Sequence, residues 1–141
     1  MKIVIAVLLI AHGLIVTAQS SSSFTPGKGV ANPSWLSWFP AGLGQSWLLV
    51  KLGIEQSFLA RAGGILWLAG GLALVAAGLG IFGFIIPFSW WRGLALAGAV
   101  ISLVMLSIYV HPFYILGIGA SVVLLVALLS KQWMLLARLG L

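Results

Sequence analysis

The chain has 141 residues, of which 62% are hydrophobic and only 6% are charged. Because a soluble domain carries about 25% charged residues, so few charges exclude a water-soluble globule, and we expect the chain to lie in a lipid bilayer. The seven Lys and Arg residues stand singly near the ends of apolar runs, which indicates membrane topology and argues against nucleic-acid binding.

The N-terminal segment predicts the first membrane span. An apolar run over 3–18 follows Met1-Lys2 and is interrupted only by His12 and Gly13. Val16 and Ala18 are small residues followed by a run of Ser, so the segment also fits a cleaved secretory signal. We expect a retained span, about 24 Å long as a helix, which brings the number of spans to four instead of three.

A connection over 19–62 follows, and its first part, "SSSSFTPGKGVANPSWLSWFPAGLG", is rich in Ser, Pro and Gly. Its aromatic residues are expected at the membrane surface, where amphipathic rings are favoured: Phe24, Trp35, Trp38 and Phe39. The stretch Ser46–Arg61 predicts a helix lying in the interface, with Lys51 and Glu55 on one face. The alternative is an early start of the next span.

Three further spans are predicted over 63–86, 93–110 and 113–130. Pro87 and the pair His111-Pro112 end two of them, and the short second connection requires adjacent, antiparallel helices. The sequence therefore predicts a single all-α domain over 1–141, an integral membrane four-helix bundle with an additional interfacial helix in the first loop.

The basic residues predict the orientation of this bundle. Four lie close to span ends on the side of both termini: Lys2, Arg92, Lys131 and Arg138. Three are spread over the long first connection: Lys28, Lys51 and Arg61. Positive-inside reasoning places both termini in the cytoplasm, in a bacterial inner membrane.

Small residues predict how the helices pack. Gly64, Gly71 and Gly78 recur every seven residues, with Gly63, Gly70 and Ala77 beside them. Small residues of the other spans include Gly98, Ser102, Gly117, Ala120 and Ser121. Close backbone approach over such residues holds helices together in lipid, so Gly71→Leu should separate them, whereas Leu74→Ala should matter little if Leu74 faces lipid. An alternative is that one small-residue face receives a partner or a flat pigment ring.

Two histidines are the candidate cofactor ligands. His12 lies near the middle of the first span, where it is either a neutral imidazole bonded to a neighbouring helix or the single axial ligand of a haem or chlorophyll. His111 lies at the outer surface, so one haem held by both histidines is disfavoured. No cofactor is specified by the residues.

The rest of the composition argues against catalysis. Glu55 is the single acidic side chain, and the chain has neither Asp nor Cys. A carboxylate pair, a Ser-His-Asp triad and an oxygen-ligand metal site are therefore excluded, and we expect neither an enzyme nor a metal site.

The motifs "LLIAHGLI", "SWLL", "GGILWLAGGLALVAAGLGIFG" and "WWRGLALAGAVISLVMLSIYVHP" resemble small uncharacterised bacterial four-helix membrane proteins, loosely DoxX-like. Members of that group often have His-Gly-Leu-Ile-His in the first span, where this chain has Val16 at the last position. The resemblance implies the four-helix fold.

The leading functional hypothesis is a non-catalytic accessory or assembly subunit, surrounded by lipid and associated with other membrane subunits or with itself. The alternatives are a haem- or chlorophyll-binding protein that uses His12 and a small-molecule or lipid carrier.

Overall fold

The computed structural model of the protein describes residues 2–24, 30–53 and 56–130, and these are mostly helical. The elements in chain order are α1 (Lys2–Phe24), η1 (Ser34–Leu36), α2 (Trp47–Lys51), α3 (Gln56–Ile81), η2 (Phe88–Trp90), α4 (Trp91–Ile108), η3 (Pro112–Tyr114) and α5 (Ile115–Leu129). The all-α fold class is confirmed.

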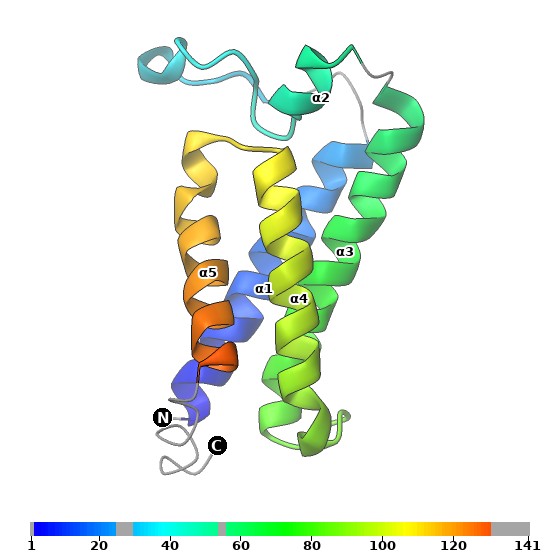
Figure 1. The fold of residues 1–141 in the computed structure, drawn as a ribbon, viewed down its shortest axis with the longest axis vertical. Helices are drawn as coiled ribbons and strands as arrows, with labels where there is room; N and C mark the ends of the chain where they lie inside the picture. The colour runs from blue at the N-terminus through cyan, green and yellow to red at the C-terminus, as the bar shows by residue number, and fades with distance from the viewer. Residues whose placement is uncertain (1, 25–29, 54–55, 131–141) are drawn as a thin grey trace.

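Four helices form a bundle in which the chain direction alternates, as Figure 1 shows. Each of them is long and apolar enough to cross a membrane, and α4, with 18 residues, spans about 27 Å against a hydrocarbon core of about 30 Å. Close packing joins α1 to α3, α3 to α4, and α4 to α5. The N-terminus and the turn between α3 and α4 lie at one end, and the long connection with α2 lies at the other (Figure 1). The predicted four-span bundle is thus confirmed.

The first helix is longer than the sequence predicts. It continues beyond residue 18 to Phe24, so the Ala18–Gln19 bond lies within α1. The Ser21 hydroxyl donates to the Ala18 carbonyl at 2.9 Å, and this back-bonding keeps a Ser-rich segment compatible with a helix.

The segment predicted as one interfacial helix over 46–61 is divided in the structure. Its first part forms α2, and residues from Gln56 onward belong to α3, as in the alternative of an early start of the span. Gly53 follows α2 with φ of +63°, a conformation that glycine adopts readily and that ends a helix. Glu55 lies outside the described residues, and with it the predicted pairing of Lys51 and Glu55.

The second span ends at Ile81, five residues before the predicted boundary at residue 86. Gly83 has φ of +66°, its N–H donates to the Gly80 carbonyl at 3.0 Å, and the Phe84 N–H donates to the Leu79 carbonyl at 3.2 Å. These two bonds are the Schellman motif, in which a left-handed glycine closes the helix. Gly83, and not Pro87, therefore terminates α3.

The connection before α2 is folded over the outer ends of the helices, where "outer" denotes the end opposite the N-terminus. Val30 and Leu43 exchange two backbone hydrogen bonds of 3.0 Å each. The Asn32 side-chain amide donates to the carbonyls of Phe39 and Ala41 at 3.2 and 2.9 Å. We call residues 30–46 the outer loop.

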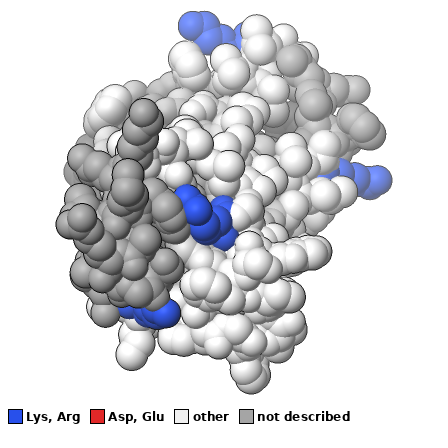
Figure 2. Space-filling model, turned by 60° about the horizontal axis from the view of Figure 1, so that its bottom comes forward, with Lys and Arg blue, Asp and Glu red and all other residues white. Residues whose placement is uncertain are grey.

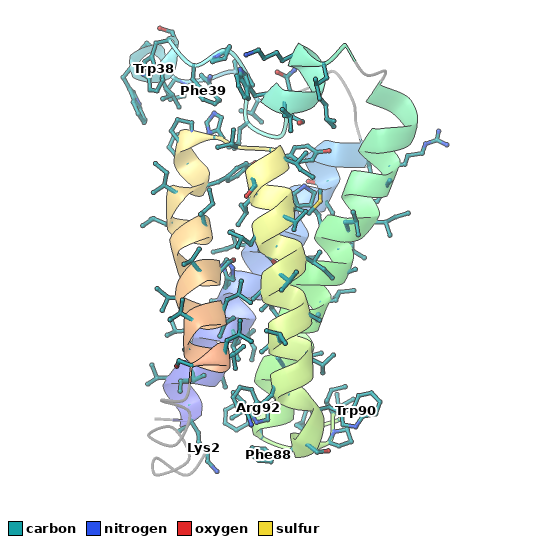
Figure 3. The ribbon with its side chains drawn as sticks, viewed as in Figure 1. Lys2, Trp38, Phe39, Phe88, Trp90 and Arg92 are labelled. Carbon is teal, nitrogen blue, oxygen red and sulfur yellow. The ribbon has the colours of Figure 1, made fainter. Side chains whose placement is uncertain are left out.

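Aromatic residues lie at both ends of the bundle (Figure 3): Trp38 and Phe39 in the outer loop, and Phe88 and Trp90 at the opposite end. Trp38 at one end and Trp90 at the other are 71% and 63% exposed, as expected of rings at the two membrane interfaces. Figure 2, viewed toward the N-terminal end, shows the described Lys and Arg side chains standing apart from one another, with no Asp or Glu among the described residues in view.

Candidate binding cleft between α1 and α5

One glycine row of α3 faces α1. A Cβ atom at Gly71 would lie 2.6 Å from the Gly13 carbonyl oxygen and would collide with the Thr17 hydroxyl. A Cβ at Gly78 would lie 2.9 Å from the Ala6 carbonyl oxygen, and one at Gly64 would meet the Phe24 ring at 2.7 Å. The backbones of α1 and α3 thus approach closely at Gly71 and Gly78, and Gly64 leaves room for the Phe24 ring.

The neighbouring glycine row of α3 faces α4. A Cβ at Gly70 would lie 3.3 Å from the Ser102 hydroxyl, and a Cβ at Gly98 would lie 2.8 Å from the Leu74 side chain. Leu74 is completely buried, so it is not a lipid-facing position and Leu74→Ala is unsuitable as a control. Both small-residue rows of α3 are consequently occupied within the chain.

The fourth span packs differently, because α5 adjoins α4 and stays further from α1 than the tightly packed pairs do. Between α1 and α5 lies a partly open cleft of about 660 Å³. Its rim is formed by exposed apolar residues on both helices: Leu8, Ile15, Leu116 and Val123. The cleft therefore opens sideways, toward the lipid that surrounds the bundle.

The cleft is long. Its lining runs from Ile5 to Gln19 on α1 and from Leu116 to Leu128 on α5, and Tyr114 also lines it. The 14 helical steps between Ile5 and Gln19 correspond to about 21 Å, and the cleft holds about 660 Å³. This shape suits an extended chain.

Two hydrogen bonds join the walls of the cleft. The ring nitrogen Nε2 of His12 lies 3.1 Å from the Ser121 hydroxyl oxygen. The Tyr114 hydroxyl donates to the Gln19 side-chain oxygen at 2.8 Å. The second bond lies seven residues along each helix from the first, about 10.5 Å nearer the outer end. His12 thus has a hydrogen-bond partner on a neighbouring helix, as expected if it is a neutral, structural imidazole.

Trp67 of α3 lies deep in the bundle and contributes to the lining of the cleft. Its side chain is 1% exposed and packs edge-on against Tyr109, with ring centroids 5.8 Å apart. Its indole N–H is buried without a hydrogen-bond partner. Such a group is costly in an apolar interior, and neither residue type nor spacing marks it in the sequence.

His111 anchors the outer loop and does not reach the cleft. Its Nδ1 accepts from the Phe113 N–H at 3.3 Å, so the proton of the neutral ring is on Nε2, which lies 3.0 Å from the Asn32 side-chain oxygen and donates to it. The ring packs edge-on against Phe39 at 5.0 Å and parallel to Phe113 at 5.4 Å. Burial lowers the pKa of His111, which favours the neutral ring that these bonds need.

The two histidines are therefore held apart in the structure, one inside the bundle and one under the outer loop. Among the described residues, no group of three or more His, Cys, Asp or Glu side chains is placed to hold a metal ion. A neighbouring-helix partner of His12 was predicted, but not that it is Ser121, 109 residues away in sequence. The Gln19–Tyr114 bond, between residues 95 apart, was not predicted.

Comparison with known proteins adds no identity. The chain matches no known protein family, and no curated protein or solved structure is significantly similar to it. The DoxX-like resemblance stays a hypothesis carried by the quoted motifs.

Proposed function

We propose that this protein is a non-catalytic membrane protein that binds a lipophilic molecule in the cleft between α1 and α5. This is the carrier alternative of the sequence analysis, and the observation that supports it is the cleft of about 660 Å³ lined by α1 and α5, two helices long and apolar enough to cross a membrane. Apolar ligands bind in largely preformed concave sites with a few placed polar groups, and His12, Gln19 and Tyr114, which line the cleft, would be such groups.

Lateral access supports the same proposal. The rim residues Leu116 and Val123 are 86% and 68% exposed, so a molecule dissolved in the bilayer would enter without crossing a polar barrier. A water-soluble ligand would have to pass either the lipid or the outer loop. The proposed ligand is therefore one that partitions into the membrane.

The experiment is solvent extraction of the protein purified from membranes in mild detergent, followed by mass spectrometry of the extract. We expect a lipophilic compound in a fixed ratio to protein that survives extensive detergent washing. An extract with the composition of the bulk membrane, in amounts that fall steadily with washing, contradicts the proposal.

The visible absorption spectrum of the same preparation tests the pigment alternative. Haem or chlorophyll ligation would need a ring nitrogen of His12, whose Nε2 lies beside Ser121. A haem or chlorophyll band that disappears in His12→Ala would replace our proposal with this alternative.

A role as an accessory subunit is the second candidate, and it is supported by how little of the last span is buried by other residues of the chain. Only 11% of the span in α5 is buried within the chain, compared with 50% of the span in α3. Helices with so little intramolecular contact are available to a neighbouring subunit or to a second copy. Cross-linking in native membranes tests this candidate, and a monomer at every protein concentration would count against it.

We also propose the bacterial inner membrane with both termini in the cytoplasm. Lys2 and Arg92 lie at the terminal end of the bundle (Figure 3), and Lys131 and Arg138 follow α5 in the sequence. Since the chain contains no cysteine, a single cysteine introduced at Ser89 or at Ser37 gives an unambiguous probe. A membrane-impermeant thiol reagent applied to intact cells should label only the cysteine at Ser37.

A further inference from the structure

We infer that the ligand of the cleft is a single-chain lipid with an uncharged polar head, bound with its head toward the outer loop. This inference rests on the proposed function and names its ligand class. Two observations support it: the order of polar and apolar residues along the cleft, and the absence of charged side chains among the described residues that line it.

The lining changes character along the cleft. The outer third holds the Gln19–Tyr114 hydrogen bond, and the middle holds the His12–Ser121 bond. Below His12 the lining residues of both walls are apolar as far as Ile5 and Leu128, over a distance of about 10.5 Å. A molecule with one polar end therefore matches the cleft in only one direction, with its tail toward the N-terminal end.

The length of the cleft favours a chain that lies along the helices. The lining on α1 spans about 21 Å, and the cleft holds about 660 Å³. Because exposed apolar residues of both helices form its rim, an acyl chain can enter from the lipid and lie along them. A single chain then places its apolar tail below His12 and its one polar end beside Gln19.

The outer loop covers the end where the head would lie. Phe113 and Tyr114 line the cleft, and the same residues carry the loop: Trp35 packs edge-on against Phe113 with centroids 5.6 Å apart, and His111 packs against Tyr114 at 5.8 Å. Figure 1 shows the loop lying across the outer ends of α4 and α5. The head would thus lie beside Gln19 and Tyr114, next to the docked outer loop.

Charge selects the head. The described residues that line the cleft include no Lys, Arg, Asp or Glu. A carboxylate or phosphate bound among these residues would lose part of its hydration without gaining an opposite charge, which is more costly than burying a neutral group with one hydrogen-bond partner. A hydroxyl, ester or other uncharged head meets no such penalty beside Gln19 and Tyr114.

The test measures binding of two radiolabelled probes with the same chain, oleyl alcohol and oleate, to the purified full-length protein in detergent at pH 9. We expect saturable binding of oleyl alcohol and binding of oleate that is weaker by at least about tenfold. Equal or tighter binding of oleate overturns this inference while leaving the proposed function standing. If neither probe binds, the proposed function fails with it, and a partner helix or the chain's own residues 131–141 become the occupants to examine.

Two substitutions on α5 provide a matched pair. Gly117 lines the cleft, and a Cβ there would lie at ordinary contact distance, 3.4 Å, from Leu106, so Gly117→Leu should fold and fill the cleft. Gly119 does not line the cleft, and a Cβ there would meet nothing within 4 Å. We expect Gly117→Leu to abolish oleyl alcohol binding and Gly119→Leu to preserve it. Ala120→Leu, also in the lining, repeats the test if Gly117→Leu fails to fold, and retention of binding in both cleft variants refutes the location.

Discussion

Gly71→Leu should separate α1 from α3, because the two backbones touch at this position. A Cβ at Gly71 would lie 2.6 Å from both the Gly13 carbonyl oxygen and the Thr17 backbone nitrogen. Ordinary contacts of a Cβ begin near 3.4 Å, so even the first added carbon requires a shift of about 1 Å, and Leu adds three more carbons. The atoms it meets are backbone atoms of a helix, which cannot rotate away as a side chain can.

The magnitude follows from two contributions. Overpacking alone costs about 1–3 kcal/mol. A gap of about 1 Å also removes a quarter to a half of the dispersion attraction of each separated atom pair, along the whole row from Gly64 to Gly78 that faces α1. We therefore expect a loss of at least about 3 kcal/mol, a large part of the roughly 5–15 kcal/mol that stabilises a typical protein.

The assay is unfolding in mixed micelles with increasing SDS, followed by circular dichroism. Gly119→Leu is the matched control, since it makes the same replacement within α5 where a Cβ meets nothing within 4 Å. The reasoning is refuted if Gly71→Leu unfolds at the same SDS fraction as the parent and Gly119→Leu.

Three further predictions concern other parts of the structure. Ser121→Ala removes the hydrogen-bond partner of His12 and should lower the free energy of unfolding by about 1 kcal/mol in the same assay. The double variant with His12→Leu should recover most of that loss, because two apolar groups then replace the bonded pair. Absence of recovery contradicts the His12–Ser121 hydrogen bond. Burial lowers the pKa of His111 in the docked outer loop, so His111 takes up a proton more readily when the loop is detached. The contribution of neutral His111 to loop docking is therefore fully present above pH 6.5 and is lost as the pH falls below it. Amide hydrogen exchange at Val30 and Leu43 should accelerate accordingly from pH 7 to pH 5, after correction for intrinsic exchange rates, and His111→Asn should remove this dependence. Ile85 has φ of +64°, a conformation that costs a β-branched residue roughly 1–2 kcal/mol. Ile85→Gly should therefore raise the SDS fraction at which the protein unfolds. A lower SDS midpoint would show that the contacts of the Ile85 side chain outweigh this backbone strain.

The packing of the spans was accessible from sequence because it depends on residue size at a fixed spacing. Gly64, Gly71 and Gly78 repeat every seven residues, and such a row on a helix is nearly straight. Which helix each row meets was not accessible, and the fully buried Leu74 illustrates this. Leu74 packs against α4, and this contact can be assigned only when the arrangement of the helices in space is known.

The ends of the helices were predicted less well, because hydropathy does not distinguish a helix from an apolar turn. Residues 82–86 are as apolar as the span before them, and the helix nevertheless ends at Ile81. The available signal was Gly83, a residue that closes helices in the left-handed conformation. At the C-terminal end of the first span, the Ser21 hydroxyl donates a hydrogen bond to a carbonyl of its own helix. The Ser run, which suggests a helix boundary in the sequence, is therefore part of α1.

The cleft itself could not be predicted, since it arises where two helices fail to pack. α3 uses both of its glycine rows, against α1 and against α4, so α5 packs against α4 and approaches the remaining face of α1 across the cleft. That face carries large side chains such as Leu8 and Ile15, and ridges of this size opposite Gly117 cannot interdigitate as closely as two rows of small residues do. In water the resulting gap would collapse under the hydrophobic effect, but lipid provides no such force between apolar helices, and hydrogen bonds at His12 and Gln19 are enough to set the width of a space that a lipid chain can fill.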